Sequence, residues 1–208
     1  MRTPIAFVDA NVLYSRTLRD WLFMLRLETA GGMFALFSSE DSLTEALYHL
    51  RKNHPDKPGR FTGKIQENIR KFLDDIVDDF PAIEFPGADE HDQHIHAAAT
   101  SVNASYLIAD DKGFHKIDKD LLAYEVHSAD SFFMLVAANA PSAVDKVIMK
   151  QVKHFSGKPG AKPLHEKLRS AGCPRFADCV LEHLKKLAAG EATHGIADSL
   201  LLLADAPA

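Results

Sequence analysis

The chain has 208 residues, of which 46% are hydrophobic and 25% are charged, and its formal net charge is −5 at pH 7. These values are typical of a soluble globular protein with one sizeable domain and an appendage. No apolar run approaches the ~20 residues that span a bilayer, and the N-terminal residues lack the apolar core of a signal peptide. We therefore expect a cytoplasmic protein that does not enter a membrane, with Cys173 and Cys179 as reduced thiols. The acidic balance argues against a protein that coats nucleic acid.

Strand and helix patterns alternate through the first 140 residues. In chain order, the expected elements are a strand over 4–8, a helix over 15–30, a strand over 33–37, a helix carrying Leu43, Leu47 and Leu50, a helix over 64–79, a strand over 81–85, a helix from 89, strands over 106–109 and 124–127, and a helix over 128–139. Ser38 or Ser39 is the expected N-cap of the helix that follows them. Such alternation predicts an α/β fold with a mostly parallel sheet flanked by helices.

The last third of the chain has only helical patterns, over 143–155, 164–171, 177–188 and 196–204. We therefore expect a first domain over residues 1–140 and a helical C-terminal extension over residues 141–208. Residues 142–170 carry a net charge of +5, and the rest of the chain carries −10. Lys146, Lys150 and Lys153 fall on one face of the expected helix. This face is either a surface for RNA phosphates or an acidic partner, or simply a solvated helix face.

Acidic residues from distant segments occur at the boundaries of the expected elements. Asp9 follows the first strand, Glu45 lies in a helix, Asp92 lies near the start of another, and Asp110 and Asp111 follow the strand over 106–109. The carboxyl ends of parallel strands meet at one sheet edge, where ligands bind. Carboxylates that converge there form a site for a hard cation such as Mg²⁺ or Mn²⁺. The pattern predicts a metal-dependent phosphodiester enzyme.

The sequence pattern supports a functional role more directly for some of these acids than for others. Asp9 comes directly after an apolar strand, where a buried charge needs a cation or a partner, and Asn11 is placed either to orient Asp9 or to bond the turn. Glu45 lies almost opposite the leucine stripe of its helix, a position that is usually just solvated. Asp92 shares a helix side with Ile95, so it is expected to face inward or into a cleft.

Three histidines, His91, His94 and His96, lie close together in the sequence. Their helical angles scatter too widely for all three to bind one zinc ion, and no pair has the four-residue spacing of a zinc helix. We expect surface histidines.

Four stretches of this chain resemble, in the expected order, the motifs of the PIN-domain ribonucleases and specifically their VapC-like toxin branch. They are Phe7-Val-Asp-Ala-Asn-Val-Leu13, Ser39-Glu-Asp-Ser-Leu-Thr-Glu-Ala-Leu47, Asp89-Glu-His-Asp-Gln-His-Ile-His-Ala-Ala-Ala99 and, less closely, Leu107-Ile-Ala-Asp-Asp-Lys-Gly-Phe114. The resemblance covers roughly the first 130 residues. It implies a PIN-like sheet and hydrolysis of single-stranded or structured RNA with Mg²⁺ or Mn²⁺. The family's members often form homodimers and are held silent by a small antitoxin protein.

The resemblance also implies a set of site residues: Asp9, Glu45, Asp92 and Asp111 as catalytic and metal-binding carboxylates. Gly113 stands where the family commonly has a further acid, so the alignment leaves Asp110 and Asp111 as alternatives. The family pattern favours Asp111. Successive side chains at a strand end point to opposite faces, so Asp110 is expected either to support the metal-binding residues from behind or to face solvent.

Two rival functions remain open on the sequence alone. A haloacid-dehalogenase-type phosphatase usually has a second acid two residues after its first aspartate, and this chain has Asn11 at that position. A non-catalytic PIN-fold module for binding RNA or protein would have lost several of the acids, whereas only the position of Gly113 departs from the pattern.

Overall fold

The computed structural model describes residues 3–156, 158, 160 and 162–191. Its contacts divide the chain into two compact units. The first unit comprises Met1–Arg19 and Ala30–Ala129, and the second comprises Asp20–Thr29 and Asp130–Ala208. The two domains expected over 1–140 and 141–208 stay a prediction. Each unit is described by itself below.

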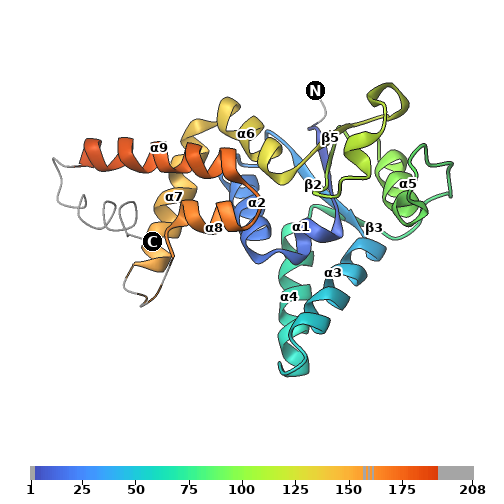
Figure 1. The fold of residues 1–208 in the computed structure, drawn as a ribbon, viewed down its shortest axis with the longest axis horizontal. Coiled ribbons are helices and arrows are strands. Elements are labelled where there is room, and N and C mark those ends of the chain that lie inside the picture. Colours follow the sequence, from blue (N-terminus) through green and yellow to red (C-terminus); the bar gives the residue numbers. More distant parts are fainter. Residues whose placement is uncertain (1–2, 157, 159, 161, 192–208) are drawn as a thin grey trace. The chain divides into compact units, whose positions relative to one another are not determined.

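The first unit is built on a parallel sheet of five strands in the order β3-β2-β1-β4-β5 (Figure 1). The strands are β1 (Ile5–Val8), β2 (Ala35–Ser39), β3 (Asp75–Val77), β4 (Tyr106–Ile108) and β5 (Glu125–His127). All four residues of the central strand β1 are buried, as expected for a parallel strand with covered faces. The expected α/β class, with a parallel sheet flanked by helices, is confirmed.

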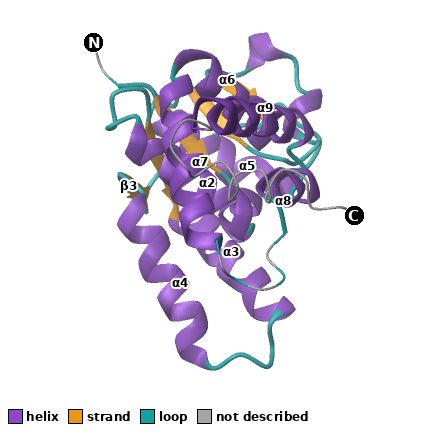
Figure 2. Cartoon of the chain, turned by 90° about the vertical axis from the view of Figure 1, so that its left-hand side faces the viewer, coloured by secondary structure: helices purple, strands orange, loops and turns teal. Residues whose placement is uncertain are grey.

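Helices connect and flank these strands. They are α1 (Ala10–Tyr14), α2 (Arg16–Glu28), α3 (Glu40–Asn53), α4 (Gly59–Phe72) and α5 (Gln93–Ser101), with 3₁₀ turns η1 (Glu90–Asp92), η2 (Phe114–Lys116) and η3 (Lys119–Leu121). Ser39 is the N-cap of α3, and its side chain accepts a hydrogen bond from the backbone N–H of Ser42. The helices α3 and α4 run side by side as a hairpin (Figure 2). On α5, Ala98 and Ala99 are fully buried in the core that contains Phe7 of β1.

Two expected elements between residues 64 and 85 are wrong. The helix α4 ends at Phe72, and residues 75–77 form strand β3, so the expected helix over 64–79 is too long. Apolar residues at 69, 73 and 76 continue the helical spacing, but Asp74 bonds the backbone of Leu36 through both its own N–H and its carboxylate, at 2.8 Å each. This pairing directs the chain onto β2. Residues 81–85 form no strand, and the short helix α1 was not expected.

The second unit consists of helices. Besides residues 20–28 of α2, it contains α6 (Ala129–Asn139, whose first residue belongs to the first unit), α7 (Pro141–Phe155), α8 (Leu164–Ser170) and α9 (Pro174–Glu191). Its core holds Trp21 and Phe133, whose rings both lie 5.1 Å from the ring of Phe176. The helices expected over 143–155, 164–171 and 177–188 are confirmed, and the one expected over 196–204 lies outside the described residues.

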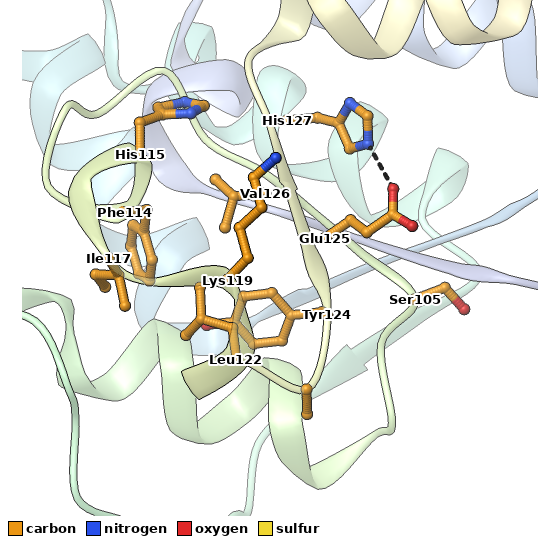
Figure 3. Close-up of a pocket in the computed structure, with 11 residues that line it drawn as sticks. Ser105, Phe114, His115, Ile117, Lys119, Leu122, Tyr124, Glu125, Val126 and His127 are labelled. Atoms are coloured by element: carbon orange, nitrogen blue, oxygen red, sulfur yellow. Dashed lines mark hydrogen bonds and ion pairs between the residues drawn. The ribbon is translucent and has the colours of Figure 1, made fainter.

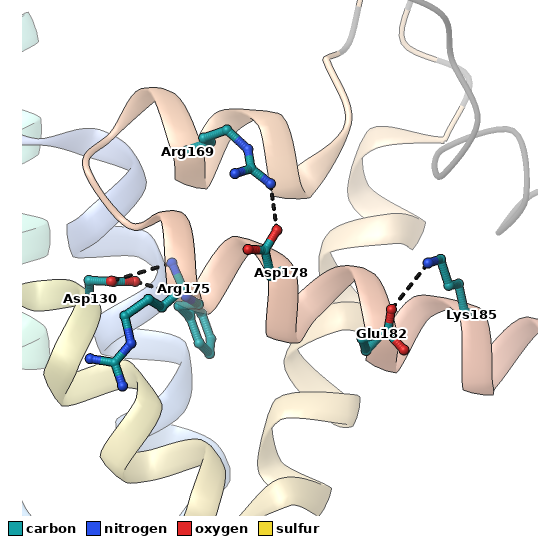
Figure 4. A network of polar contacts seen from close by, with 7 residues as sticks. Asp130, Arg169, Arg175, Asp178, Glu182 and Lys185 are labelled. Atoms are coloured by element: carbon teal, nitrogen blue, oxygen red, sulfur yellow. Dashed lines mark hydrogen bonds and ion pairs between the residues drawn. The ribbon is translucent and has the colours of Figure 1, made fainter.

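Asp130 fixes the start of α9. Its buried carboxylate accepts hydrogen bonds from the backbone N–H groups of Phe176 and Arg175, at 2.8 and 3.3 Å (Figure 4). A carboxylate at a helix N-terminus satisfies N–H groups that have no partner within the helix. The pair of Arg169 and Asp178, at 2.6 Å, joins α8 to α9.

Two further findings concern the expected environment. Within the described residues, no single helix is long and apolar enough to cross a membrane. The helices α6 and α7 together have sufficient length and apolar composition, but they are bent by 114° where they join. Cys173 is buried, and Cys179 is half-buried.

Candidate acidic site

The sheet reverses its direction of growth at strand β1. From β1 the chain continues to β2 and β3 on one side, whereas β4 and β5 are added on the other side. In open α/β sheets, ligands bind outside the carboxyl ends of the two strands at this switch point. Asp9 comes directly after β1, and its N–H donates to the carbonyl oxygen of Ile108 at the end of β4, at 3.0 Å. Asp9 therefore lies at the switch point.

Asp9 is also the N-cap of α1, and only 4% of its surface is exposed. Its carboxylate accepts hydrogen bonds from the backbone N–H of Ala10, at 2.6 Å, and from the side-chain amide of Asn11, at 2.5 Å. Burial raises the pKa of Asp9 to about 7; the Ala10 N–H opposes this rise, and the charges of three nearby acids add to it. Those acids are Glu45, Asp92 and Asp111. The buried carboxylate is thus surrounded by like charge.

Asn11 joins the two strand ends. Its amide nitrogen donates to Asp9, and its carbonyl oxygen accepts from the backbone N–H of Asp110 at 3.3 Å. Of the two roles considered for Asn11 from the sequence, the contact that orients Asp9 is present, and the second contact reaches the loop after β4 instead of the turn after β1. Asn11 holds the carboxylate of Asp9 in place relative to the loop after β4.

Asp92 is the last residue of η1, directly before α5. Its Oδ2 atom is buried and has no hydrogen-bond partner within the described residues. Burial raises the pKa of Asp92 to about 6, the charges of Asp111 and Asp89 raise it further, and His94 opposes the rise. A buried carboxylate oxygen without a partner is costly unless a cation or a proton meets it.

Asp110 and Asp111 have different surroundings. The carboxylate of Asp110 accepts a hydrogen bond from the backbone N–H of Ala129, the first residue of α6, at 2.8 Å. Asp111 instead lies beside Asp92: a Cβ atom added to Gly113 would be 2.8 Å from Oδ1 of Asp111 and 2.8 Å from Oδ2 of Asp92. The two carboxylates therefore face the same small space, and the absence of a side chain at position 113 keeps it open.

Glu45 is an exposed residue on α3. Its side chain is 46% exposed and lies 3.6 Å from His49, one turn further along α3. It is close enough to raise the pKa values of Asp9 and Asp92. Glu45 also lines a hollow of about 520 Å³ together with Asp41, Thr44, Tyr48 and His94. We call this cavity the α3 hollow.

The structure thus brings Asp9, Glu45, Asp92 and Asp111 within electrostatic reach of one another, and we call them the acidic cluster. Their oxygen atoms are the ligands that Mg²⁺ and Mn²⁺ prefer, and the partnerless Oδ2 of Asp92 fits such an ion. Within the described part of the chain, however, no three His, Cys, Asp or Glu side chains stand ready to bind one ion together. Side-chain movement of the exposed Glu45 and Asp111 would be needed to complete the ligand set.

The expectation of surface histidines is wrong for His96. Its side chain is buried, its Nδ1 forms a hydrogen bond of 2.8 Å with the hydroxyl of Tyr124, and its ring packs on Phe85. Burial lowers the pKa of His96, which favours the neutral ring. His91 is exposed, and His94 is half-buried, with an Nε2 atom that has no hydrogen-bond partner among the described residues.

A second pocket, of about 670 Å³, lies along the edge strand β5 (Figure 3). Phe114, Ile117 and Leu122 form apolar walls, and Lys119 extends between His115 and His127. None of the four acids lines this larger pocket. Sequence reasoning found neither this pocket nor the α3 hollow, because each depends on how side chains from several elements come together in the fold. Comparisons with family models, with curated proteins and with solved structures find no match to this chain.

Proposed function

We propose that the first unit is a PIN-like, Mg²⁺- or Mn²⁺-dependent endoribonuclease that hydrolyses phosphodiester bonds of RNA at the acidic cluster. One observation carries the proposal: Asp9 is buried at the switch point of a parallel sheet, close enough to acids from three other segments (Glu45, Asp92 and Asp111) for their charges to act on it. Mutual repulsion of this kind favours either proton uptake or a bound cation. The order of the four motifs supports the same assignment.

Asp9, Asp92 and Asp111 would hold the cation, with Glu45 reaching the cluster from α3. A divalent cation in such a site supplies charge that polarises the scissile phosphate and lowers the pKa of a water molecule. Hydrolysis forms a bond between the water oxygen and phosphorus, breaks the bond to the leaving oxygen, and requires a group that accepts the water proton. Ala10 and Asn11 orient Asp9 for its part in this site.

The branch that these motifs resemble suggests a biological setting. In this proposal the protein is the toxin of a toxin–antitoxin pair, acts as a homodimer in the cytoplasm, and is silenced by a small antitoxin protein. An adjacent open reading frame for a small protein, which binds this chain and stops RNA cleavage when co-expressed, would support the setting. Growth unaffected by expression of the active protein would argue against it.

A second candidate is a non-catalytic PIN-like module that binds RNA or protein. One observation favours it, namely that no three metal-ligating side chains among the described residues stand ready to bind one ion. In that case RNA would bind and stay intact in the presence of either metal ion.

The experiment that separates the two candidates is an RNA cleavage assay with the purified full chain. We expect cleavage with Mg²⁺ or Mn²⁺, none with a chelator, and none with Asp9→Asn or Asp92→Asn. The matched control is Glu90→Gln, which removes an exposed acid two residues before Asp92 and should leave the rate unchanged. Cleavage that persists undiminished in Asp9→Asn would rule out the acidic cluster as the active site.

A further inference from the structure

The α3 hollow adjoins the acidic cluster through Glu45, which belongs to both. On α3, Thr44 and Glu45 lie about one turn after Asp41 and one turn before Tyr48, so the four residues share one side of the helix. His94, from the first turn of α5, forms the opposite wall. Any molecule that occupies this hollow is next to the candidate cleavage site.

Tyr48 is an unusually exposed aromatic residue. Its exposed fraction is 60%, and its contacts are the ring of His49, at 5.5 Å between centroids, and the ammonium group of Lys52, 6.0 Å from its own ring centroid. An exposed aromatic ring of this kind offers a face on which a second flat ring can stack. Burial of that face would also remove apolar surface from water.

The charges of the hollow restrict what can lie on Tyr48. Asp41 and Glu45 are acids, and the other lining residues are Thr44, Tyr48 and His94. A phosphate group would be repelled by the two carboxylates, whereas an uncharged flat ring would not. Lys52, one turn beyond Tyr48 and outside the hollow, supplies positive charge for a neighbouring phosphate. This division of charge suits a nucleotide whose base lies in the hollow.

We propose that Tyr48 positions the substrate: an unpaired nucleobase stacks on its ring, which places the adjoining phosphodiester bond at the acidic cluster. The inference rests on the proposed ribonuclease function. Both faces of a base in a duplex are covered by its neighbours, so a base can reach Tyr48 only from a single-stranded segment. Tyr48 is thus a residue that positions the substrate and selects for single strands.

Binding can be measured without cleavage in the full chain that carries Asp9→Asn. The probe is a fluorescein-labelled single-stranded RNA oligonucleotide that contains 2-aminopurine, whose emission falls when it stacks. A further change of Tyr48→Ala should raise the Kd about tenfold and restore the emission, because base–aromatic stacking is lost. Tyr48→Phe, which keeps the ring, should stay within about twofold of the parent, and Tyr48→Leu, which keeps only bulk, should resemble Tyr48→Ala.

Leu121→Ala is the matched control, because it removes an equally exposed apolar side chain, 61% exposed, that does not line the hollow. It should leave the Kd unchanged. Equal affinity of Tyr48→Ala and its parent for single-stranded RNA would overturn the proposal. So would a Tyr48→Leu variant that binds as tightly as Tyr48→Phe. If Tyr48→Ala instead changes only the molar mass of the protein in solution, the exposed ring belongs to a contact between protein copies, and the proposal is again overturned.

Failure of this inference is distinguishable from failure of the proposed function. If the chain cleaves RNA with Mn²⁺ and Tyr48→Ala leaves kcat/KM for single strands unchanged, the nuclease stands and the stacking site falls. If Tyr48→Ala weakens RNA binding but the unmodified chain never cleaves, the stacking site stands as part of a binding module and the nuclease falls.

Discussion

Asp92 and Gly113 lie so close together that a Cβ atom at position 113 would be 2.8 Å from Oδ2 of Asp92. Gly113 has ordinary helical backbone angles, with φ −60° and ψ −57°, so the backbone does not require glycine there. The requirement comes from the carboxylates, because the same Cβ would also meet Asp111. An acidic side chain at position 113 has no room here unless both aspartates move.

We therefore expect Gly113→Ala to lower the rate of RNA cleavage while the protein stays folded. The added methyl group displaces Asp92 or Asp111, and misplacement of a catalytic group by about 1 Å can cost on the order of 100-fold in rate. Gly63→Ala is the control, because nothing lies within 4 Å of its added Cβ and α4 should gain roughly 0.5–1 kcal/mol of stability. Equal activity of the two variants would show that the space at Gly113 is unimportant.

The raised pKa of Asp9 predicts how stability depends on pH when a chelator is present. Because the pKa is about 7 in the folded protein and 3.8 ordinarily, the folded state binds more protons than the unfolded chain between these values. The free energy of unfolding should therefore fall as pH rises from about 4 to about 7. Asp9→Asn, which cannot ionise, should lose the part of this slope that Asp9 contributes, whereas the part from Asp92, whose pKa is raised to about 6, should remain. Above pH 7 its free energy of unfolding should exceed that of the parent by on the order of a few kcal/mol. Urea titrations across this pH range measure both quantities, and an identical slope in Asp9→Asn would assign it to other groups.

Substitution of Asp110 should mainly lower stability, whereas substitution of Asp111 should mainly abolish activity. Asp110→Ala removes the acceptor for the Ala129 N–H at the start of α6 and should lower the free energy of unfolding by about 1 kcal/mol. Asp111→Asn should leave stability nearly unchanged and abolish cleavage. The pair of measurements is urea unfolding and RNA cleavage for each variant. The assignment of Asp111 to the cluster fails if Asp110→Asn is the inactive variant and Asp111→Asn is active.

The lysines of α7 test whether the second unit takes part in RNA binding. Lys146, Lys150 and Lys153 are exposed on α7, whereas Val144, Ile148 and Val152 are buried, and Lys150 also pairs with Glu28. If all three contact phosphates, their replacement by glutamine should reduce the slope of log Kd against log salt by about 2.

The control for this variant is a change of equal charge at Lys57, Lys64 and Lys71, in the α3–α4 hairpin and its loop, with affinity for RNA measured at several salt concentrations. A slope that changes equally in both triple variants would reflect net charge alone. An unchanged slope in the α7 variant, together with unchanged affinity for any protein partner, would leave those lysines as a solvated helix face.

The sequence was most informative where one element determines a position by itself. The apolar run before Asp9 predicted a strand end, and the serines before α3 predicted its cap, because both signals are local. The strand β3 could not be predicted, since Leu73 and Ile76 continue the helical spacing of α4 and only pairing of Asp74 with Leu36 decides between helix and strand. Tertiary pairing outweighed the local pattern there.

The same contrast between local signals and long-range contacts holds for the candidate site. The pattern identified the four acids but not the space between Asp92 and Asp111, which depends on Gly113 coming close to both. It also placed His96 at the surface, because its partner Tyr124 is 28 residues away in the sequence. The α3 hollow could not be predicted either, because its lining combines Tyr48 and Glu45 of α3 with His94 of α5, which is distant in the sequence.

The most direct test of this account is the binding of Mn²⁺ to the full chain, measured by electron paramagnetic resonance of the free ion. We predict saturable binding to the parent chain and to Glu90→Gln, and loss of that binding in Asp9→Asn and Asp92→Asn, because the last two remove carboxylates from the acidic cluster. Binding that is absent from the parent chain, or that survives in both Asp9→Asn and Asp92→Asn with unchanged affinity, would contradict a metal site at the switch point of the sheet.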